Sequence, residues 1–111
     1  MQVQVDIQDL LKTRLDVSLE QIGDFCRRWQ ISELALFGSV LRDDFSDASD
    51  VDLLVSYGDG ARFGLRDFLL MRDELEGMFG RSPDLLEKDL IENPFLRSEV
   101  LGSAVVIYGA E

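Results

Sequence analysis

Hydrophobic residues recur at steps of three and four positions in two long segments, which is the period of a helix with one buried face. The first segment ends near Trp29 and opens with Ser18 and Gln21, which have the spacing of a capping box. The second covers residues 65–79 and is followed by Gly80, a residue type that often ends helices. The pattern therefore predicts two amphipathic helices that pack one face against an apolar partner.

Four short apolar runs without a helical period predict buried strands between the helices. These runs cover residues 34–37, 51–55, 85–86 and 104–108. Two shorter helices are predicted over residues 7–15 and 94–101, and a helical turn over residues 40–44. The alternating order predicts an α/β fold, a small mixed β-sheet flanked by helices. We expect one domain over residues 1–111, with residues 1–17 as an N-terminal extension.

The composition argues against nucleic-acid binding and against catalysis that depends on histidine. The chain has 111 residues, 22 Asp and Glu against 11 Lys and Arg, and a net charge of −11. Such a balance argues against direct nucleic-acid binding, which needs many cations paired with phosphates. The absence of histidine excludes triads and zinc sites built on imidazole. Cys26, the single cysteine, lies on an apolar helix face and is interpreted as a buried structural thiol.

The candidate chemistry lies between the first two predicted strands. Gly38 and Ser39 stand where a buried strand ends, so a phosphate could approach the backbone and accept hydrogen bonds there. Ten residues later come Asp50 and Asp52, which would share one face if both lay on a strand. Paired carboxylates repel each other unless a cation lies between them, and Mg²⁺ bridges carboxylates to substrate phosphates. This combination predicts nucleotidyl transfer from a nucleoside triphosphate.

A simpler interpretation is that these acids form a solvated strand edge, since the chain is rich in aspartate. The apolar residues around the Asp pair favour a site over that alternative. Asp43, Asp44 and Asp47 crowd the same loop, and for them solvated surface acids are the better interpretation.

From about Leu19 to Tyr108 the chain resembles the minimal nucleotidyltransferases of the DNA-polymerase-β-like superfamily, in the group that serves as antitoxins to HEPN-domain toxins. The resemblance rests on segments in the family's order: ALFGSVLRDDF, SDVDLLV, MFGR, PDLLEK and AVVIYG. It implies the nucleotidyltransferase fold. It also implies that Gly38 and Ser39 bind phosphate, that Asp50 and Asp52 are catalytic metal ligands, and that Arg42 serves the triphosphate or the partner.

The resemblance also implies a third catalytic acid on the next strand, and Asp84 occupies that position. Pro83 precedes it, where the family usually has a β-branched apolar residue. Because proline removes one ladder amide, we expect this strand to start late or lie at an edge. The alternative for Asp84 is a turn or helix-cap residue after proline.

By resemblance, the chain is a Mg²⁺-dependent adenylyltransferase that moves AMP from ATP to a tyrosine of a HEPN toxin, with Mn²⁺ as a possible replacement. A reducing cytoplasm is the expected location, and no membrane span or signal peptide is predicted. Two alternatives stay open. One is a binding module that neutralises the toxin by occlusion, and the other is a transferase acting on a small molecule.

Overall fold

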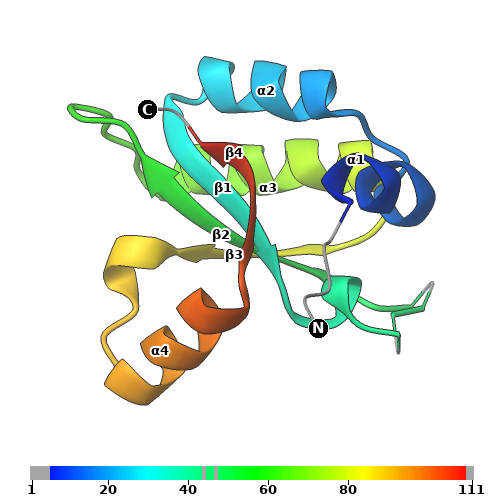
Figure 1. The fold of residues 1–111 in the computed structure, drawn as a ribbon. Helices are drawn as coiled ribbons and strands as arrows, with labels where there is room; N and C mark the ends of the chain where they lie inside the picture. Colours follow the sequence, from blue (N-terminus) through cyan, green and yellow to red (C-terminus); the bar gives the residue numbers. More distant parts are fainter. Residues whose placement is uncertain (1–5, 44, 47, 110–111) are drawn as a thin grey trace.

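The computed structural model describes residues 6–43, 45–46 and 48–109, and the elements form a layered α/β fold around one mixed sheet (Figure 1). The four strands are β1 (Ile31–Phe37), β2 (Val51–Tyr57), β3 (Pro83–Glu87) and β4 (Val105–Gly109), in the order β3-β2-β1-β4. Strand β1 pairs antiparallel with β2 and β4, whereas β2 and β3 are parallel. The predicted mixed sheet flanked by helices is confirmed.

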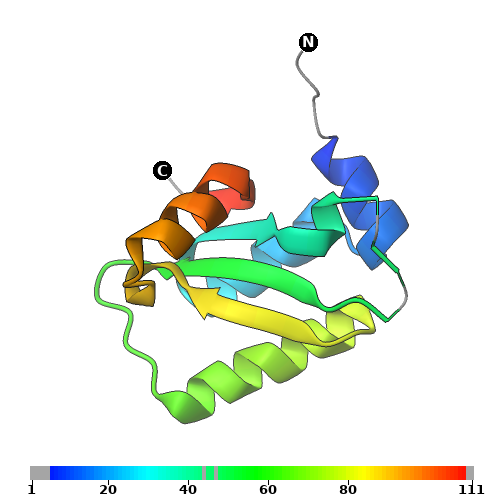
Figure 2. The ribbon, with the colours of Figure 1, turned by 90° about the horizontal axis from the view of Figure 1, so that it is seen from below.

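Helices cover both faces of the sheet. The α-helices are α1 (Ile7–Leu10), α2 (Leu19–Arg28), α3 (Leu65–Phe79) and α4 (Pro94–Ser103). A π-helix, η1 (Leu11–Leu15), continues α1, and short 3₁₀ turns follow β1 and β3 as η2 (Gly38–Leu41) and η3 (Lys88–Leu90). Helices α3 and α4 lie on opposite faces of the sheet (Figure 2).

Alternation along the strands divides the core in two, since successive side chains of a strand point to opposite faces. In β2, Val51, Leu53 and Val55 join a large core with the buried residues of α2, α3 and η1. Leu54 points the other way and packs with Val100 of α4 in a smaller core. The end of this second face that carries Asp52 and Asp84 is not filled by that smaller core.

Local sequence signals account for three helix ends. Ser18 and Gln21 form the predicted capping box, and Gly80 ends α3 in a left-handed conformation with φ of 70°. Helix α4 starts at Pro94, and the Asn93 side chain accepts hydrogen bonds from the first helical amides.

Several predicted bounds were wrong. The segment 7–15 is not one regular helix, because it changes from α to π geometry at Leu11. The turn predicted at residues 40–44 is a 3₁₀ helix that begins earlier, at Gly38. Strand β3 begins at Pro83 rather than residue 85, since the parallel ladder with β2 extends to that residue. It is an edge strand, as expected for a strand that begins with proline.

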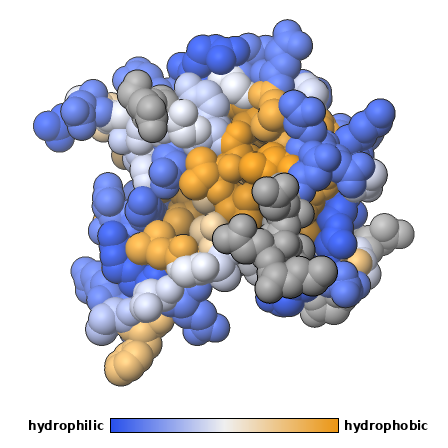
Figure 3. Space-filling view, viewed as in Figure 1, coloured by the Kyte–Doolittle hydropathy of each residue, from blue (hydrophilic) through white to orange (hydrophobic). Residues whose placement is uncertain are grey.

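The surface is mostly polar. The face shown in Figure 3 has an apolar area near its centre, surrounded by hydrophilic side chains. Cys26 is fully buried in the large core, as predicted. Within the part of the chain that the structure describes, no helix is long and apolar enough to span a bilayer.

Candidate functional site

The turn after β1 brings the backbone against Asp52. Phe37 pairs with Asp52 across the β1–β2 ladder, and Gly38 then turns away with φ of 76°. A Cβ atom on Gly38 would lie 2.1 Å from Asp52 Oδ2. Only glycine tolerates both this left-handed conformation and this approach. The Asp52 carboxylate therefore lies directly against the turn that carries Ser39.

Strand register brings the third predicted acid beside the second. Asp52 and Asp84 are direct partners in the parallel β2–β3 ladder, so their side chains lie on the same face. Asp84 therefore belongs to a strand, and the alternative of a turn residue after Pro83 is wrong. Strand β2 begins at Val51, as predicted, so Asp50 lies one residue before it and is exposed.

Asp52 lies among other acidic side chains. Partial burial raises the pKa of its carboxyl, the negative charges of Asp84 and Asp50 raise it further, and a hydrogen bond with Asp84 adds to the effect. The positive charge of Arg42 opposes this rise. All three predicted acids thus lie within electrostatic reach of one another, and a bound cation would relieve their repulsion.

These side chains offer only carboxylate oxygens, which suit a hard cation such as Mg²⁺. Over residues 6–43, 45–46 and 48–109, no three acidic or sulfur-bearing side chains form a preformed metal cage. Mg²⁺ is usually held by one or two carboxylates together with substrate phosphates and water. Asp50 and Asp84 also line a shallow depression of about 520 Å³ at the sheet edge, together with Arg72 of α3.

The other predicted site residues lie on the same turn. Ser39 is half-buried in η2, and its carbonyl accepts a hydrogen bond from the Arg42 amide at 2.9 Å. Arg42 is exposed and close enough to Asp52 to affect its pKa. Asp43 is exposed, as predicted for a surface acid, whereas residues 44 and 47 lie outside the described part of the chain.

Two nearby residues had no predicted role. Arg72 of α3 lines the depression with Asp50 and Asp84, and its position beside these acids depends on how α3 packs on β3. Arg14, from the N-terminal extension, contacts the backbone of the turn. No motif in the sequence indicated either contact, because both join segments that are distant along the chain.

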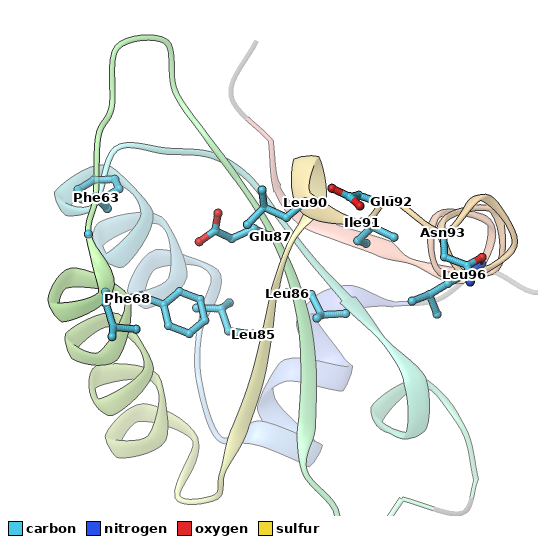
Figure 4. A pocket seen from close by; sticks show the side chains of 12 residues that line it. Phe63, Phe68, Leu85, Leu86, Glu87, Leu90, Ile91, Glu92, Asn93 and Leu96 are labelled. Atoms are coloured by element: carbon cyan, nitrogen blue, oxygen red, sulfur yellow. The ribbon is translucent and has the colours of Figure 1, made fainter.

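An apolar groove of about 760 Å³ adjoins the depression and shares Phe68 and Leu85 with it. Figure 4 shows the groove between α3 and α4, with β3 side chains along its floor. Leu90 is 69% exposed at its rim, and Glu87 and Glu92 supply acidic groups. The groove thus presents leucine and phenylalanine side chains to solvent next to the acidic residues.

The chain is similar in sequence and in fold to known proteins. A family model described as "Nucleotidyltransferase domain" matches residues 19–107. A protein of Methanocaldococcus jannaschii named "putative protein adenylyltransferase" is 33% identical over 75 residues, which are 68% of this chain and 77% of that protein.

Solved structures share the fold. One described as "putative minimal nucleotidyltransferase" has a TM-score of 0.67 at 30% identity, covering 94% of this chain and 98% of that one. A toxin–antitoxin structure determined with AMP-PNP has a TM-score of 0.69 at 18% identity, covering 86% of this chain and 76% of that one. The matched family, the fold and the related proteins together show that the chain belongs to the nucleotidyltransferase domain family and is a nucleotidyltransferase.

Proposed function

We propose that residues 1–111 act as a single minimal nucleotidyltransferase domain that transfers AMP from ATP to a tyrosine of a partner toxin of the HEPN class, and so acts as its antitoxin. The observation that carries this proposal is the placement of Asp52 between Asp84 and the Gly38 turn. Asp52 and Asp84 offer carboxylates for a cation, and the adjacent turn at Gly38 offers backbone groups for phosphates. We place the reaction in the cytoplasm, where ATP is supplied.

Each site residue has a distinct role in this proposal. Backbone groups at Gly38 and the hydroxyl of Ser39 bind the phosphates, and Arg42 offsets part of their charge. Asp50, Asp52 and Asp84 would hold Mg²⁺, which neutralises the triphosphate and lowers the pKa of a hydroxyl when bound. Without a cation these carboxylates repel ATP, so the reaction requires a divalent ion.

The reaction is an in-line displacement at the α-phosphorus. The tyrosine oxygen forms a bond to this phosphorus, and the bond to the oxygen that bridges to the β-phosphate breaks. Pyrophosphate leaves with that electron pair, and the hydroxyl proton passes to a carboxylate oxygen of Asp84 that does not bind the cation. Most of the rate enhancement would come from orientation and charge, since the protein forms no covalent intermediate.

A protein acceptor is supported by two observations. Solved relatives in fold include toxin–antitoxin complexes, one with AMP-PNP and one described as MntA-HepT. The groove beside the acids exposes Leu90, Leu96 and other apolar side chains, which is typical of surfaces that contact proteins. A transferase for small molecules would need an enclosed acceptor pocket, and the depression at the acids is shallow and open.

The exposed groove also favours the second candidate function, in which binding alone neutralises the toxin. The two functions differ in their dependence on the acids. Occlusion needs the groove and tolerates loss of Asp52, whereas AMP transfer needs both.

The test is transfer of label from α-³²P-ATP to the purified toxin partner with Mg²⁺. We expect one AMP per acceptor tyrosine by mass spectrometry, and no transfer with EDTA or with the Asp50→Asn/Asp52→Asn variant. Asp59→Asn, at a turn remote from the site, is the matched control and should transfer normally. Transfer by the double variant would overturn the mechanism, and toxin neutralisation by that variant would favour occlusion.

A further inference from the structure

An arginine from the N-terminal extension holds the backbone of the phosphate-binding turn. Arg14 Nη1 donates hydrogen bonds to the carbonyl oxygens of Val40 and Arg42, at 2.9 Å and 2.5 Å. These carbonyls belong to the turn that carries Ser39 and Arg42. One guanidinium group therefore fixes two peptide groups of the turn at once.

The support for Arg14 is rigid. It belongs to the π-helix η1, whose flanking residues Leu11 and Leu15 are fully buried in the large core. Helix segments with π geometry occur often at functional sites. Because both of these residues are buried, the backbone that carries Arg14 is anchored in the core.

A second arginine holds the other end of the same loop. Arg81 Nη1 donates to the carbonyl oxygens of Ser46 and Ser49, at 2.6 Å and 3.2 Å. The ring of Phe45 lies 4.4 Å from the Arg81 guanidinium carbon and 5.7 Å from that of Arg14. Both distances allow cation–π attraction, so Phe45 links the two arginines.

Fixing a carbonyl also fixes an amide, since the peptide group is planar and trans. The Val40 carbonyl and the Leu41 N–H belong to one peptide unit, and the Arg42 carbonyl and the Asp43 N–H to the next but one. Arg14 thus sets the orientation of two peptide groups in the turn that carries Gly38 and Ser39, the residues proposed to bind phosphate. A turn that is ordered before the ligand arrives costs less conformational entropy when the ligand binds.

We propose that Arg14 is a positioning residue that preorganises the turn at Gly38–Arg42 for the phosphates of ATP. The proposal rests on the function proposed above. Arg14 lies outside residues 19–107, the segment matched by the family model. This role therefore belongs to the N-terminal extension of this chain.

The test compares Arg14→Met, Arg14→Lys and the control Lys12→Met by calorimetric titration with Mg-ATP. Lys12 is exposed on the same helical segment. We expect Arg14→Met to weaken binding about tenfold, because the turn must then be ordered when Mg-ATP binds. Arg14→Lys should recover part of the affinity, because its ammonium can still donate to a carbonyl, and Lys12→Met should bind normally.

A purely structural role would lower the melting temperature of Arg14→Met and leave its affinity for Mg-ATP unchanged well below that temperature. Unchanged affinity would overturn the proposal. Amide hydrogen exchange at Leu41 and Asp43 gives an independent measurement, and we expect it to be faster in Arg14→Met than in Lys12→Met. If the wild-type protein fails to bind Mg-ATP, the proposed function is wrong, and equal exchange rates would show separately that Arg14 does not hold the turn.

Discussion

At the scale of single residues, Gly38 has the most constrained position in the site. Its conformation is left-handed, and the space that a side chain would need is filled by the Asp52 carboxylate. Gly60 has a similar φ of 82°, but no atom lies within 4 Å of the place where its Cβ would be. Alanine substitutions at Gly60 and Gly38 therefore separate two contributions to the free energy of unfolding: the left-handed backbone conformation and the close contact with Asp52.

We expect Gly60→Ala to destabilise the protein by about 1 kcal/mol, the usual cost of a left-handed alanine. Gly38→Ala should cost more, about 2–4 kcal/mol, because a carboxylate must also move. It should lose AMP transfer as well, since the Asp52 carboxylate is displaced. Urea denaturation and a transfer assay measure the two effects. Equal stability and activity of the two variants would contradict the packing argument.

Cys26 is a buried thiol for which we expect no reactivity in the folded protein. Burial raises the pKa of its thiol to about 12, despite the nearby charge of Arg27. We expect no reaction with iodoacetamide in the folded protein at pH 8 and full modification in 8 M urea, because the thiolate is the reactive form. Mass spectrometry after brief labelling measures both. Rapid labelling without urea would show that the core opens around α2.

At the scale of elements, Glu74 of α3 connects the two helices that cover one face of the sheet. It forms an ion pair with Arg28 of α2 and accepts a hydrogen bond from Trp29 Nε1 at 3.1 Å. The pKa of Glu74 is lowered, first by its hydrogen bond with Arg28. Sequence patterns predicted both helices, but no local pattern indicated this contact, which joins residues far apart along the chain.

The sign of this pKa shift gives a pH dependence. A lowered pKa in the folded state contributes stability above the unfolded value, about 4.5, and that stability is lost as the pH falls through the folded value. We expect Glu74→Gln to be less stable than the wild type at pH 7, with the difference shrinking below pH 4. Glu76→Gln, on an exposed position of α3, should show no such difference. Urea midpoints at both pH values measure it.

At the scale of the whole molecule, the site couples strands that are separate in the sequence, so its ligand should stabilise the fold. Ligands that bind only the folded state add about 2.7 kcal/mol at one hundred times the dissociation constant. We expect Mg-ATP to raise the melting temperature, and ATP with EDTA to raise it far less. Asp50→Asn/Asp52→Asn should abolish the shift, whereas Asp59→Asn should retain it. A full shift with EDTA would contradict a cation-dependent site.

The relation between sequence and structure was closest where the signals were local. The capping box at Ser18 and Gly80 at the end of α3 were correctly predicted as helix ends, because each signal depends only on residues nearby in the chain. The start of β3 was misplaced, because the ladder with β2 reaches Pro83 and no local pattern indicates such pairing. The start of β2 at Val51 was predicted correctly, and Asp50 lies just before it.

The sequence by itself determined the α/β order, the candidate residues and the chemical constraint that any catalysis must use carboxylates rather than imidazole. These follow from composition, spacing and resemblance, which need no coordinates. Only the tertiary structure decided that Asp84 pairs with Asp52, that Gly38 abuts the Asp52 carboxylate and that Arg14 holds the turn. Each of these contacts joins segments brought together by strand register and core packing, so no local pattern specifies them.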